Sequence, residues 1–540
     1  MIAIQQEQID AQQKQIASQQ AQLEALANDL QLLKRALYGH RRERFDDPHQ
    51  GTLFDSEWTG SPKDDEALDN RSTVDDVDSA STSRRGGHRG RIVIPEAMPR
   101  KEVVHPLREE DIPEHLRGRD DLRRFRKKVG QYIEIVEASG YVVEEFVEVL
   151  AADNDDSTET EMVNAPRPPR ILNSYAGSSL LASFVVDRFA DYLPYYRLEE
   201  RINRLGLKIP RSTISRWMIQ LSQAVLPLVE LMRSEAKTSE VICVDETPVK
   251  LLKPGRSKTS YLWTVVGDEQ HPYNVYYFTE NRSRAGPEQF LEGYSGVLVS
   301  DAYVCYESLQ SEWAEQMAWA CCHAHARRKF EEVHYLGATR QTTKALSYFQ
   351  LLFDIEDEGR TMSADERLAL RQKESCPVLE QFKTWMDERL ATMRPKHVLR
   401  KPIEYMTKRW PSFERFLESG AIPIENNAAE RSVKLPVIAK KNHLFFASSD
   451  GGEAAMIFYS FTSTCRRLHI DPTAYLNDIF RQLPTMPKNQ LESLLPDQWI
   501  AQHPEHRLQL RADEAEQKAR TKQRRRTQRR KLLRKKLVGK

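Results

Sequence analysis

Cysteine is scarce in this sequence and unevenly placed. Only 6 of the 540 residues are cysteines, the first is Cys243, and no two are spaced as C-x-x-C. A disulfide framework and a cysteine zinc ribbon both depend on closely spaced cysteines, so the sequence argues against both. We accordingly expect no zinc requirement.

Long apolar runs are missing as well. No stretch approaches the ~20 apolar residues that a membrane-spanning helix needs. The chain also does not open with a charged segment followed by an apolar one. These two absences predict a cytoplasmic protein with no membrane partner.

The whole chain has almost no excess of either charge sign, but some of its segments have a strong excess. The net charge is +1, yet residues 46–80 carry 11 acidic and 2 basic side chains, and residues 518–540 carry 13 lysines or arginines and no acid. Such segregation predicts an anionic partner for the basic parts. The basic tail favours nucleic acid, bound without sequence preference.

The N-terminal residues contain a heptad repeat. Apolar residues recur at every seventh position: Ile2, Ile9, Ile16, Leu23, Leu30 and Leu37. This spacing predicts a coiled coil over residues 1–45, through which copies of the chain associate; the alternative is a helix packed on its own domain. Residues 46–99 are acidic and poor in apolar side chains, which is typical of a disordered linker.

Residues 100–165 show partial alternation of apolar and polar side chains. The stretches QYIEIVEA (131–138) and YVVEEFVEVL (141–150) predict two strands of a hairpin around Ser139 and Gly140.

Residues 166–238 have a helical pattern that contains the stretch LEERINRLGLKIPRSTISRWM. A first helix is expected to end at Gly206 and a second to begin near Pro210. This arrangement is similar to a helix-turn-helix, whose second helix places its N-terminal residues in the major groove of DNA. An ordinary helical hairpin fits the local pattern equally well. The groove-facing candidates are Arg211, Ser212, Thr213, Ser215 and Arg216.

Two buried-strand patterns close with an aspartate. VICVD ends at Asp245 and GVLVSD ends at Asp301, and in an open sheet functional groups gather at strand ends. A later helical stretch, IPIENNAAERSVKL, places Asn426, Asn427 and Glu430 at positions i, i+1 and i+4, which predicts a carboxylate flanked by two amides. The alternative is a solvated helix start, since asparagine is a good N-cap residue.

Three carboxylates that converge repel one another unless a cation lies between them. Oxygen ligands suit hard divalent ions, Mg²⁺ above all, and two such ions about 3.5–4 Å apart serve phosphoryl transfer. Three strands in succession, a helix and a fourth strand, with aspartates on the first and fourth, resemble a ribonuclease-H-like catalytic core. A helical insertion at about 312–420 would separate Asp301 from Glu430. The expected fold class is α/β and multidomain.

Several stretches together resemble the large transposase of the insertion-sequence-66 family, from the heptads to about Trp499. They are LLKRALYGHRRERF, DYLPYYRLEERINRLGLKIPRSTISRW, VDETPV, SDAYVCY, CCHAHARRKF, GAIPIENNAAERSVKLPVIAKKNHLFFASSDGGEAA and LLPDQW. The resemblance implies a DDE-type transposase with an acidic triad. The triad is Asp245, Asp301 and Glu430, with Glu246 and Glu425 as competing acids.

The resemblance also implies the reaction and the partners. The protein would bind the terminal inverted repeats of an insertion sequence, cut the element's end to leave a 3′-hydroxyl, and join that hydroxyl to target DNA. It would use two Mg²⁺ or Mn²⁺ ions, bind double-stranded DNA at the element ends and the target, and work with two small companion proteins of the same element. Asn426, Asn427 and His325 would support the third carboxylate or touch DNA.

Basic residues near the expected site are candidates for contacts with DNA phosphates. In CCHAHARRKF, Cys322, His323 and His325 have the chemistry of metal ligands, but His323 and His325 are two positions apart and point to different sides of a helix. A DNA contact is therefore favoured for the basic residues beside them. The candidates are Arg327, Arg328 and Lys329, and after the catalytic helix Arg431, Lys434, Lys440, Lys441 and Asn442. For this second group a solvated face is an equal alternative.

The expected division of the chain follows from these patterns. It comprises the coiled coil 1–45, the linker 46–99, a small hairpin module 100–165 that replaces the cysteine zinc module usual in relatives, a helix-turn-helix-like domain 166–238, a catalytic domain 239–485 and a C-terminal segment 486–540 with a basic tail. Two other functions stay open: a catalytically silent protein that binds element ends or regulates, and a structure-selective nuclease of the same fold.

Overall fold

The computed structural model of the protein describes residues 142–144, 149–153, 160–164, 168–518, 520–521 and 524. All of them belong to one compact unit of the chain. The predicted coiled coil, the acidic linker, the first predicted strand at 131–138 and the end of the basic tail lie outside the described residues.

A short antiparallel hairpin comes first among the described elements. It joins β1 (Val149–Asp153) to β2 (Thr160–Asn164). Residues 142–144, which were expected in a strand, have no regular structure. Strand β1 therefore begins near the end of the predicted strand 141–150. Its partner β2 follows it in the sequence, whereas the predicted partner, 131–138, precedes it.

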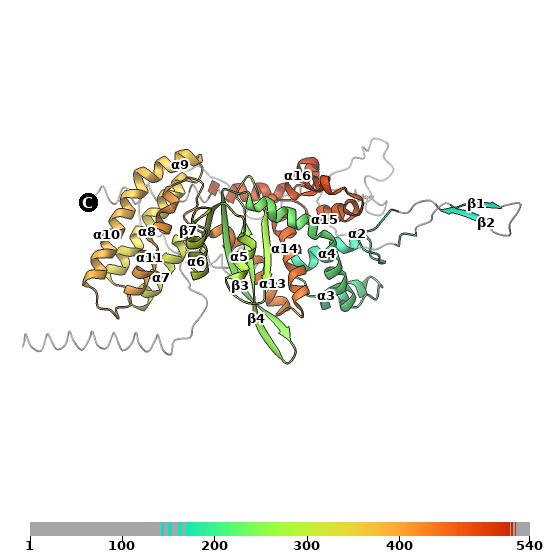
Figure 1. Ribbon diagram of the computed structural model, residues 1–540, viewed down its shortest axis with the longest axis horizontal. Coiled ribbons are helices and arrows are strands. Elements are labelled where there is room, and N and C mark those ends of the chain that lie inside the picture. The colour runs from blue at the N-terminus through green and yellow to red at the C-terminus, as the bar shows by residue number, and fades with distance from the viewer. Residues whose placement is uncertain are drawn as a thin grey trace, which may run out of the picture. The chain divides into compact units, whose positions relative to one another are not determined.

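A five-stranded mixed sheet runs through the described chain (Figure 1). Its spatial order is β5-β4-β3-β6-β7: the first three strands form an antiparallel meander, and β6 and β7 run parallel to β3. Parallel neighbours need crossover connections, which α5 (Ala285–Leu291) and α6 (Val304–Glu312) provide. The strands are β3 (Val241–Lys253), β4 (Arg256–Val266), β5 (Asn274–Thr279), β6 (Gly296–Ser300) and β7 (Met317–Cys321).

Strand β7 corrects one sequence expectation. Residues from 312 onward were expected to be helical, yet Met317–Cys321 form the edge strand beside β6. A five-residue apolar run has too few positions to distinguish a buried strand from a buried helix turn by periodicity. Pairing with β6 decides the conformation here.

Strand β3 agrees with the sequence pattern. The stretch EVICVDETPVKLL (240–252) is strand-like, and β3 runs past the apolar part that closes at Asp245 to Lys253. Only Val241–Cys243 pair with β6, whereas β4 pairs with β3 from Cys243 onward. Asp245 therefore lies just past the point where β3 leaves β6 and continues beside β4 alone.

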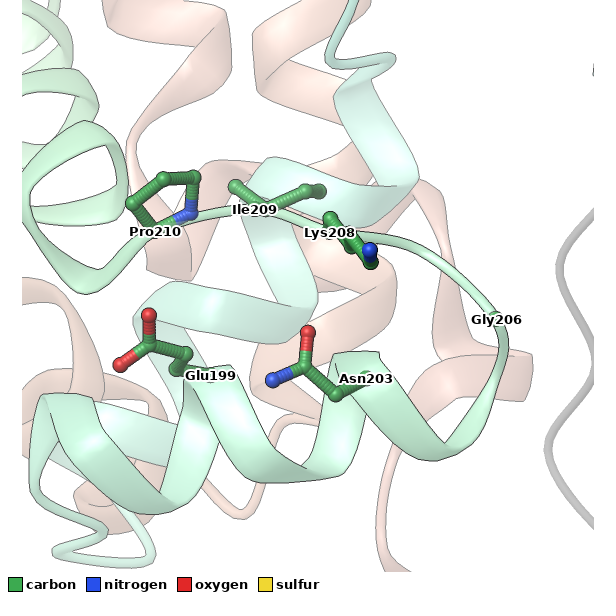
Figure 2. A pocket seen from close by; sticks show the side chains of 6 residues that line it. All are labelled: Glu199, Asn203, Gly206, Lys208, Ile209 and Pro210. Carbon is green, nitrogen blue, oxygen red and sulfur yellow. The ribbon is translucent and has the colours of Figure 1, made fainter.

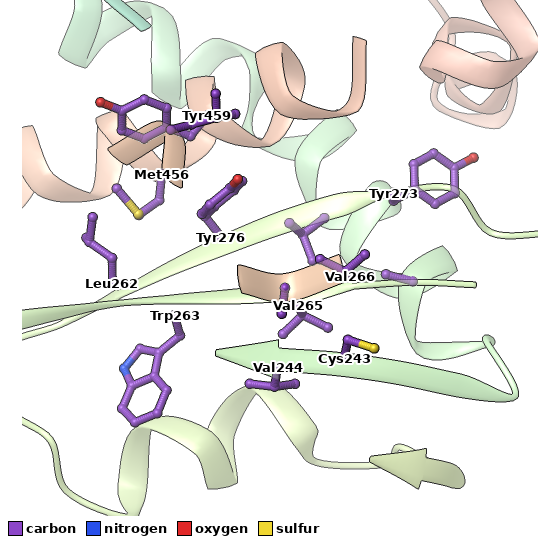
Figure 3. Packing of buried hydrophobic residues seen from close by; sticks show 14 of the residues in the cluster. Cys243, Val244, Leu262, Trp263, Val265, Val266, Tyr273, Tyr276, Met456 and Tyr459 are labelled. Atoms are coloured by element: carbon purple, nitrogen blue, oxygen red, sulfur yellow. The ribbon is translucent and has the colours of Figure 1, made fainter. Parts of the chain in front are cut away.

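Different helices cover the two faces of the sheet, because side chains alternate along each strand. The rings of Trp263 and Tyr277 lie 5.8 and 4.8 Å from the ring of Phe290 in α5. Tyr276 points to the other face, 6.0 Å from Tyr459 of α14 (Ser449–Leu468). Figure 3 shows Trp263 and Tyr276 on opposite sides of the strands. The sheet is thus the middle layer between helices.

Helix α14 also covers the open edge of the sheet at β5. An edge strand presents unpaired N–H groups. The backbone N–H groups of Asn274 and Tyr276 donate to the hydroxyls of Thr464 and Ser460, both at 3.0 Å. The hydroxyl-rich sequence of α14 therefore lets a helix take the place of a sixth strand.

Residues 323–417 form a helical segment between β7 and the return to the sheet. At its centre, Phe382 contacts the rings of Tyr348, Phe349, Trp385 and Phe330, with centroids 4.8–6.1 Å apart. The segment contains α7 (His323–Leu336), α8 (Arg340–Gly359), α9 (Ala364–Leu370), the π-helix η4 (Arg371–Ser375), α10 (Cys376–Thr392), α11 (Arg400–Thr407), α12 (Trp410–Glu414) and η5 (Arg415–Leu417). Helix α13 (Asn427–His443) then returns to contact β3 and β4.

Helices α2 (Ser178–Phe189), α3 (Tyr195–Arg204) and α4 (Arg211–Lys237) precede the sheet, and α15 (Pro472–Gln482) and α16 (Pro496–Gln502) follow α14. Helix α4 packs against α14 and β5. None of the helices in the described part of the chain has the length and apolar character that a bilayer crossing requires.

Candidate active site

Asp245 lies on the face of the sheet that α13 and α14 cover. In the register of the sheet it is opposite Thr264, which is itself opposite Tyr276. Glu246, the next residue, is opposite Trp263 and points to the other face. The alternation of β3 therefore assigns Asp245, and not Glu246, to the side of the sheet where Glu430 arrives on α13.

Asp301 follows β6 directly, at the carboxyl end of the strand next to β3. Its carboxylate accepts a hydrogen bond from the N–H of Tyr303 at 3.2 Å. The N–H of Ala302 donates to the hydroxyl of Tyr405 at 3.3 Å. These bonds hold the loop after β6 at the sheet edge where functional groups of parallel strands gather.

Glu430 lies in the first turn of α13, and Asn426 ties the start of this helix to the sheet. Asn426 is fully buried. Its side-chain amide donates to the carbonyl of Val244 at 2.7 Å, its backbone N–H donates to the sulfur of Cys322 at 3.1 Å, and its carbonyl accepts the N–H of Glu430 at 3.1 Å. One residue thus links three segments: β3 beside Asp245, the junction of β7 and α7, and the helix that carries Glu430.

The acidic residues form one electrostatic cluster. Burial raises the pKa of Asp245 to about 8, and the negative charges of Glu246, Glu430 and Asp301 contribute to the increase. Like charges raise a carboxyl pKa in this way when they lie within several ångströms. The charge after β6 and the charge on α13 are therefore within electrostatic range of Asp245 on β3.

The two competing acids also form pairs of their own, although burial and the charge of Asp301 raise the pKa of Glu246. Glu246 forms an ion pair with Arg282, whose guanidinium lies 4.0 Å from the ring centroid of Tyr303. Glu425 accepts a hydrogen bond from the side-chain amide of Asn427. Asn427 therefore holds Glu425, while Asn426 positions the helix of the third carboxylate.

The two histidines of α7 lie in different surroundings. His323 is 1% exposed and lies between Phe413 and Phe416, with ring centroids 5.2 and 5.1 Å away. Burial lowers its pKa to about 3, so it is a neutral core residue. His325 faces the cluster, with Nδ1 3.6 Å from Oε1 of Glu430. Burial lowers the pKa of His325, and the charge of Glu430 opposes that change.

Cys322 lies on the same side as His325. One donor atom each from Cys322, His325 and Glu430 lies within 4.8 Å of the other two. Burial raises the pKa of the Cys322 thiol to about 12. The site therefore combines a group of carboxylates with an adjoining sulfur and nitrogen donor.

Comparison with known families identifies the chain. The sequence profile described as Transposase IS66 family matches residues 173–454, slightly more than half of the chain, and the profile described as IS66 C-terminal element matches residues 460–496. The chain belongs to the IS66 family of transposases. The first match contains Asp245, Asp301 and Glu430.

Curated relatives of this IS66-family chain come from Sinorhizobium fredii. The uncharacterized protein y4hP is 30% identical over 345 residues, which cover 60% of this chain and 62% of the relative. The uncharacterized protein y4jD is 30% identical over 358 residues, 64% of this chain and 70% of the relative. For the uncharacterized protein y4qI the identity is 31% over 352 residues, 62% of this chain and 65% of the relative. The chain thus spans about two thirds of the length of these relatives.

The basic residues of α7 in this IS66-family chain differ in their surroundings. Arg328 points to the site, with Nη2 4.0 Å from Oε1 of Glu430. Arg327 pairs with Glu331 at 2.9 Å. Lys329 lies over a tyrosine ring at 4.5 Å. Of these three, Arg328 is best placed to meet a phosphate near the carboxylates.

The candidates on α13 divide in the same way. Arg431 and Lys441 are exposed and Lys434 is half-buried. Lys440 donates to a hydroxyl and a backbone carbonyl of β3, and Asn442 donates to a backbone carbonyl that precedes α3. Lys440 and Asn442 therefore stabilise the packing of α13.

Helices α3 and α4, joined by a short turn, cover the stretch whose sequence predicted a helix-turn-helix. The turn between them contains Gly206 at φ +83°, a conformation that glycine adopts without strain. On the first turns of α4, Arg211, Ser212 and Arg216 are exposed, and Thr213 and Ser215 are half-buried. Figure 2 shows a pocket between α3 and this turn, lined by Glu199, Asn203, Gly206, Lys208, Ile209 and Pro210.

Sequence reasoning missed two features of the site. It did not identify the ion pair of Arg282 with Glu246, for which no motif exists. It also did not predict that Cys322 receives a hydrogen bond from Asn426, 104 positions further along the chain. The one signal in the sequence was local composition: Cys322 lies beside two histidines, and Asn426 lies beside a second asparagine.

Proposed function

We propose that this protein is a DDE-type DNA transposase that binds the terminal inverted repeats of an insertion sequence and catalyses Mg²⁺-dependent strand cleavage and strand transfer. The observation that carries the proposal is the convergence of Asp245, Asp301 and Glu430. Membership of the IS66 family supports a transposase function. The strand order, with a three-stranded meander followed by two parallel strands, supports a ribonuclease-H-like core.

The donor set fits a divalent cation with oxygen ligands. Burial and the acidic neighbours raise the pKa of Asp245. Oε1 of Glu430 is buried without a hydrogen-bond partner. Such a group of like charges is costly unless a cation offsets the repulsion. Asp245, Asp301 and Glu430 would hold Mg²⁺ or Mn²⁺. When bound, two such ions supply activation of the attacking oxygen and stabilisation of the leaving oxygen.

Other residues of the chain position the carboxylates and the DNA. Asn426 holds the start of α13 against β3, so that the positions of Glu430 and Asp245 relative to each other are fixed. Arg328 lies near the acidic cluster and binds a phosphate that flanks the reacting one, and Arg431, exposed and next to Glu430 in sequence, is a second candidate for such a contact. Burial lowers the pKa of His325, which favours the neutral imidazole beside Glu430.

The remaining parts of the chain would select the DNA and assemble the complex. In this proposal the first turns of α4 read the element's ends, with the exposed Arg211 and Arg216 meeting the DNA. The coiled coil at 1–45 pairs protomers, and the basic tail adds affinity that depends on salt. Two small companion proteins of the same element complete the assembly.

The test is strand joining by the full-length protein. The substrate is a labelled duplex copied from the DNA that flanks the coding sequence, incubated with target DNA and Mg²⁺. Asp301→Asn is compared with Asp387→Asn, which changes an exposed carboxylate of α10 that pairs with Lys383. We expect joined product from the wild type and Asp387→Asn, none from Asp301→Asn, and equal end binding by all three.

The alternative functions predict other products. Cut ends that are never joined would indicate a structure-selective nuclease. Specific binding of element ends without any cleavage would indicate a silent end-binding protein. Equal joining by Asp301→Asn would contradict the assignment of the acidic triad.

A further inference from the structure

Cys322, His325 and Glu430 form a donor set that differs in chemistry from the three carboxylates. Cys322 is the N-cap residue of α7, His325 lies in the first turn of that helix, and Glu430 lies in the first turn of α13. The hydrogen bond from the N–H of Asn426 to the Cys322 sulfur joins the two helix starts. The three donors are therefore held by rigid elements, within 4.8 Å of one another.

Two of these donor atoms are buried and have no hydrogen-bond partner. They are Nδ1 of His325 and Oε1 of Glu430, and they lie 3.6 Å apart. Buried polar atoms are normally paired, because an unpaired one loses its interaction with water and gains nothing in return. An ion that both atoms bind would provide the missing interaction. His323 cannot contribute, since its ring is enclosed by two phenylalanines.

The nature of the donors indicates which ion this would be. Hard ions such as Mg²⁺ take oxygen ligands, whereas a thiol sulfur and an imidazole nitrogen favour zinc. Sites with three protein ligands of mixed cysteine, histidine and carboxylate type occur for zinc, with a fourth position open. The charges of Arg328 and Lys329 both reach His325. Lys329 lies over the Tyr405 ring, and the side chain of Arg328 is 44% exposed, so it can turn to solvent when a metal ion binds.

We propose that Zn²⁺ binds to Cys322, His325 and Glu430 and inhibits the enzyme by occupying Glu430. The binding rests on the geometry of the three donors alone. The inhibition rests on the proposed function, in which Glu430 holds the catalytic Mg²⁺. Zinc is then a regulator of the site and not a structural requirement, in keeping with the absence of a cysteine zinc module.

The binding is tested on the full-length protein with Co²⁺, a spectroscopic substitute for zinc. We expect a near-ultraviolet thiolate-to-cobalt band that disappears when Zn²⁺ is added. Cys322→Ser and His325→Gln lose the band or shift it, whereas Cys376→Ser keeps it, because Cys376 is the half-exposed cysteine of α10. Zinc affinity falls at least roughly tenfold in Cys322→Ser, since loss of a second-shell partner alone costs about 10–100-fold.

Two results would overturn the site: no cobalt band in the wild type, or a band that persists in Cys322→Ser. Far-ultraviolet circular dichroism of each variant shows whether it folds. His325→Gln keeps the thiol, so it tests the ligand set independently of any effect of the cysteine on folding.

The inhibition is tested by adding Zn²⁺ to strand-joining reactions in excess Mg²⁺. Each variant is compared with its own rate without zinc. We expect zinc to stop joining by the wild type and Cys376→Ser, and Cys322→Ser to need at least roughly tenfold more zinc. A cobalt band without inhibition would refute the proposal that zinc inhibits the enzyme, but it would support the metal-binding site. Absence of joining in every variant would count against the proposed function, while the cobalt titration still decides the metal site.

Discussion

Two clusters of buried charge in this protein are built in opposite ways. In the helical segment, Arg371 is 1% exposed, and its Nε and Nη2 atoms bind the two carboxylate oxygens of Glu356, each at 2.7 Å. Its Nη1 atom donates to the carbonyls of Phe416 and Ser419 at the same distance. Where β3 leaves β6, by contrast, half-buried Asp245 lies beside other carboxylates, and burial together with their charges raises its pKa.

The difference separates charge that supports the fold from charge that serves a reaction. A buried ion pair with every donor satisfied is compatible with a stable interior, and loss of one partner is strongly destabilising. A buried group of like charges weakens the fold, so its presence indicates a function that needs those charges. Substitutions in the two clusters should therefore have opposite effects on stability and on activity.

The largest effect is expected for the acidic triad. Asp245→Asn, Asp301→Asn and Glu430→Gln each remove a ligand that contributes several kcal/mol of transition-state stabilisation, so joining should fall by roughly 10³-fold or more. The unfolding free energy of the metal-free variants should stay the same or rise, because repulsion is relieved. Joining rates and denaturant unfolding are measured on the same samples. A loss of stability that parallels the loss of activity would remove the contrast with Arg371.

The buried ion pair should behave in the reverse way. Arg371→Met leaves charged Glu356, whose side chain is only 14% exposed, without this partner, which should cost about 3–5 kcal/mol of unfolding free energy. The rate of joining per folded molecule should not change. Denaturant unfolding measures the first quantity, and active-site titration with element-end DNA normalises the second. Arg360→Met is the control, because Arg360 is exposed and pairs at the surface, where such pairs contribute about 0–1 kcal/mol.

Asn426 connects the two kinds of effect. Asn426→Ala removes the donor to the Val244 carbonyl and leaves a buried acceptor unsatisfied, at a cost of about 1–3 kcal/mol. Because the same residue fixes the start of α13, joining per folded molecule should fall as well. Asn427→Ala, which changes the partly exposed neighbour, should affect both less. Equal effects of the two substitutions would show that Asn426 does not position Glu430.

The pKa of Asp245 predicts a pH dependence of stability. The pKa is raised from 3.8 to about 8 in the folded protein. Between these pH values the folded state holds a proton that the unfolded chain releases, so stability falls as pH rises through this window. The slope for one proton is about 1.4 kcal/mol per pH unit. Unfolding of the protein in chelator at pH 5, 6.5 and 8 checks this, and Asp245→Asn should show a flatter dependence.

The smallest effect is expected outside the sheet. Arg211→Ala on α4 should weaken binding of element ends and lower the salt dependence by about one phosphate contact. Titration of a labelled end at several salt concentrations measures the slope. Lys408→Ala, which removes an exposed cation of the helical segment, is the control. An unchanged slope in Arg211→Ala would indicate that α4 does not meet the DNA backbone at this position.

Local patterns predicted the parts of the sheet and site that depend on neighbours in sequence. The apolar runs that lead to Asp245 and Asp301 and the helix start at Asn426 were readable because burial and helix spacing repeat over a few residues. Strand β7 was not, since its pairing with β6 decides its conformation. The contact between Cys322 and Asn426 also depends on the tertiary fold, so no sequence spacing could indicate it.

The most direct test compares two glutamates, Glu430 at the sheet edge and Glu356 in the helical segment. Glu430→Gln and Glu356→Gln are measured side by side for joining per folded molecule and for unfolding free energy. We predict that Glu430→Gln is as stable as the wild type and joins no ends, whereas Glu356→Gln is less stable and joins them at the normal rate. Normal joining by folded Glu430→Gln would contradict the assignment of the sheet edge as the catalytic site.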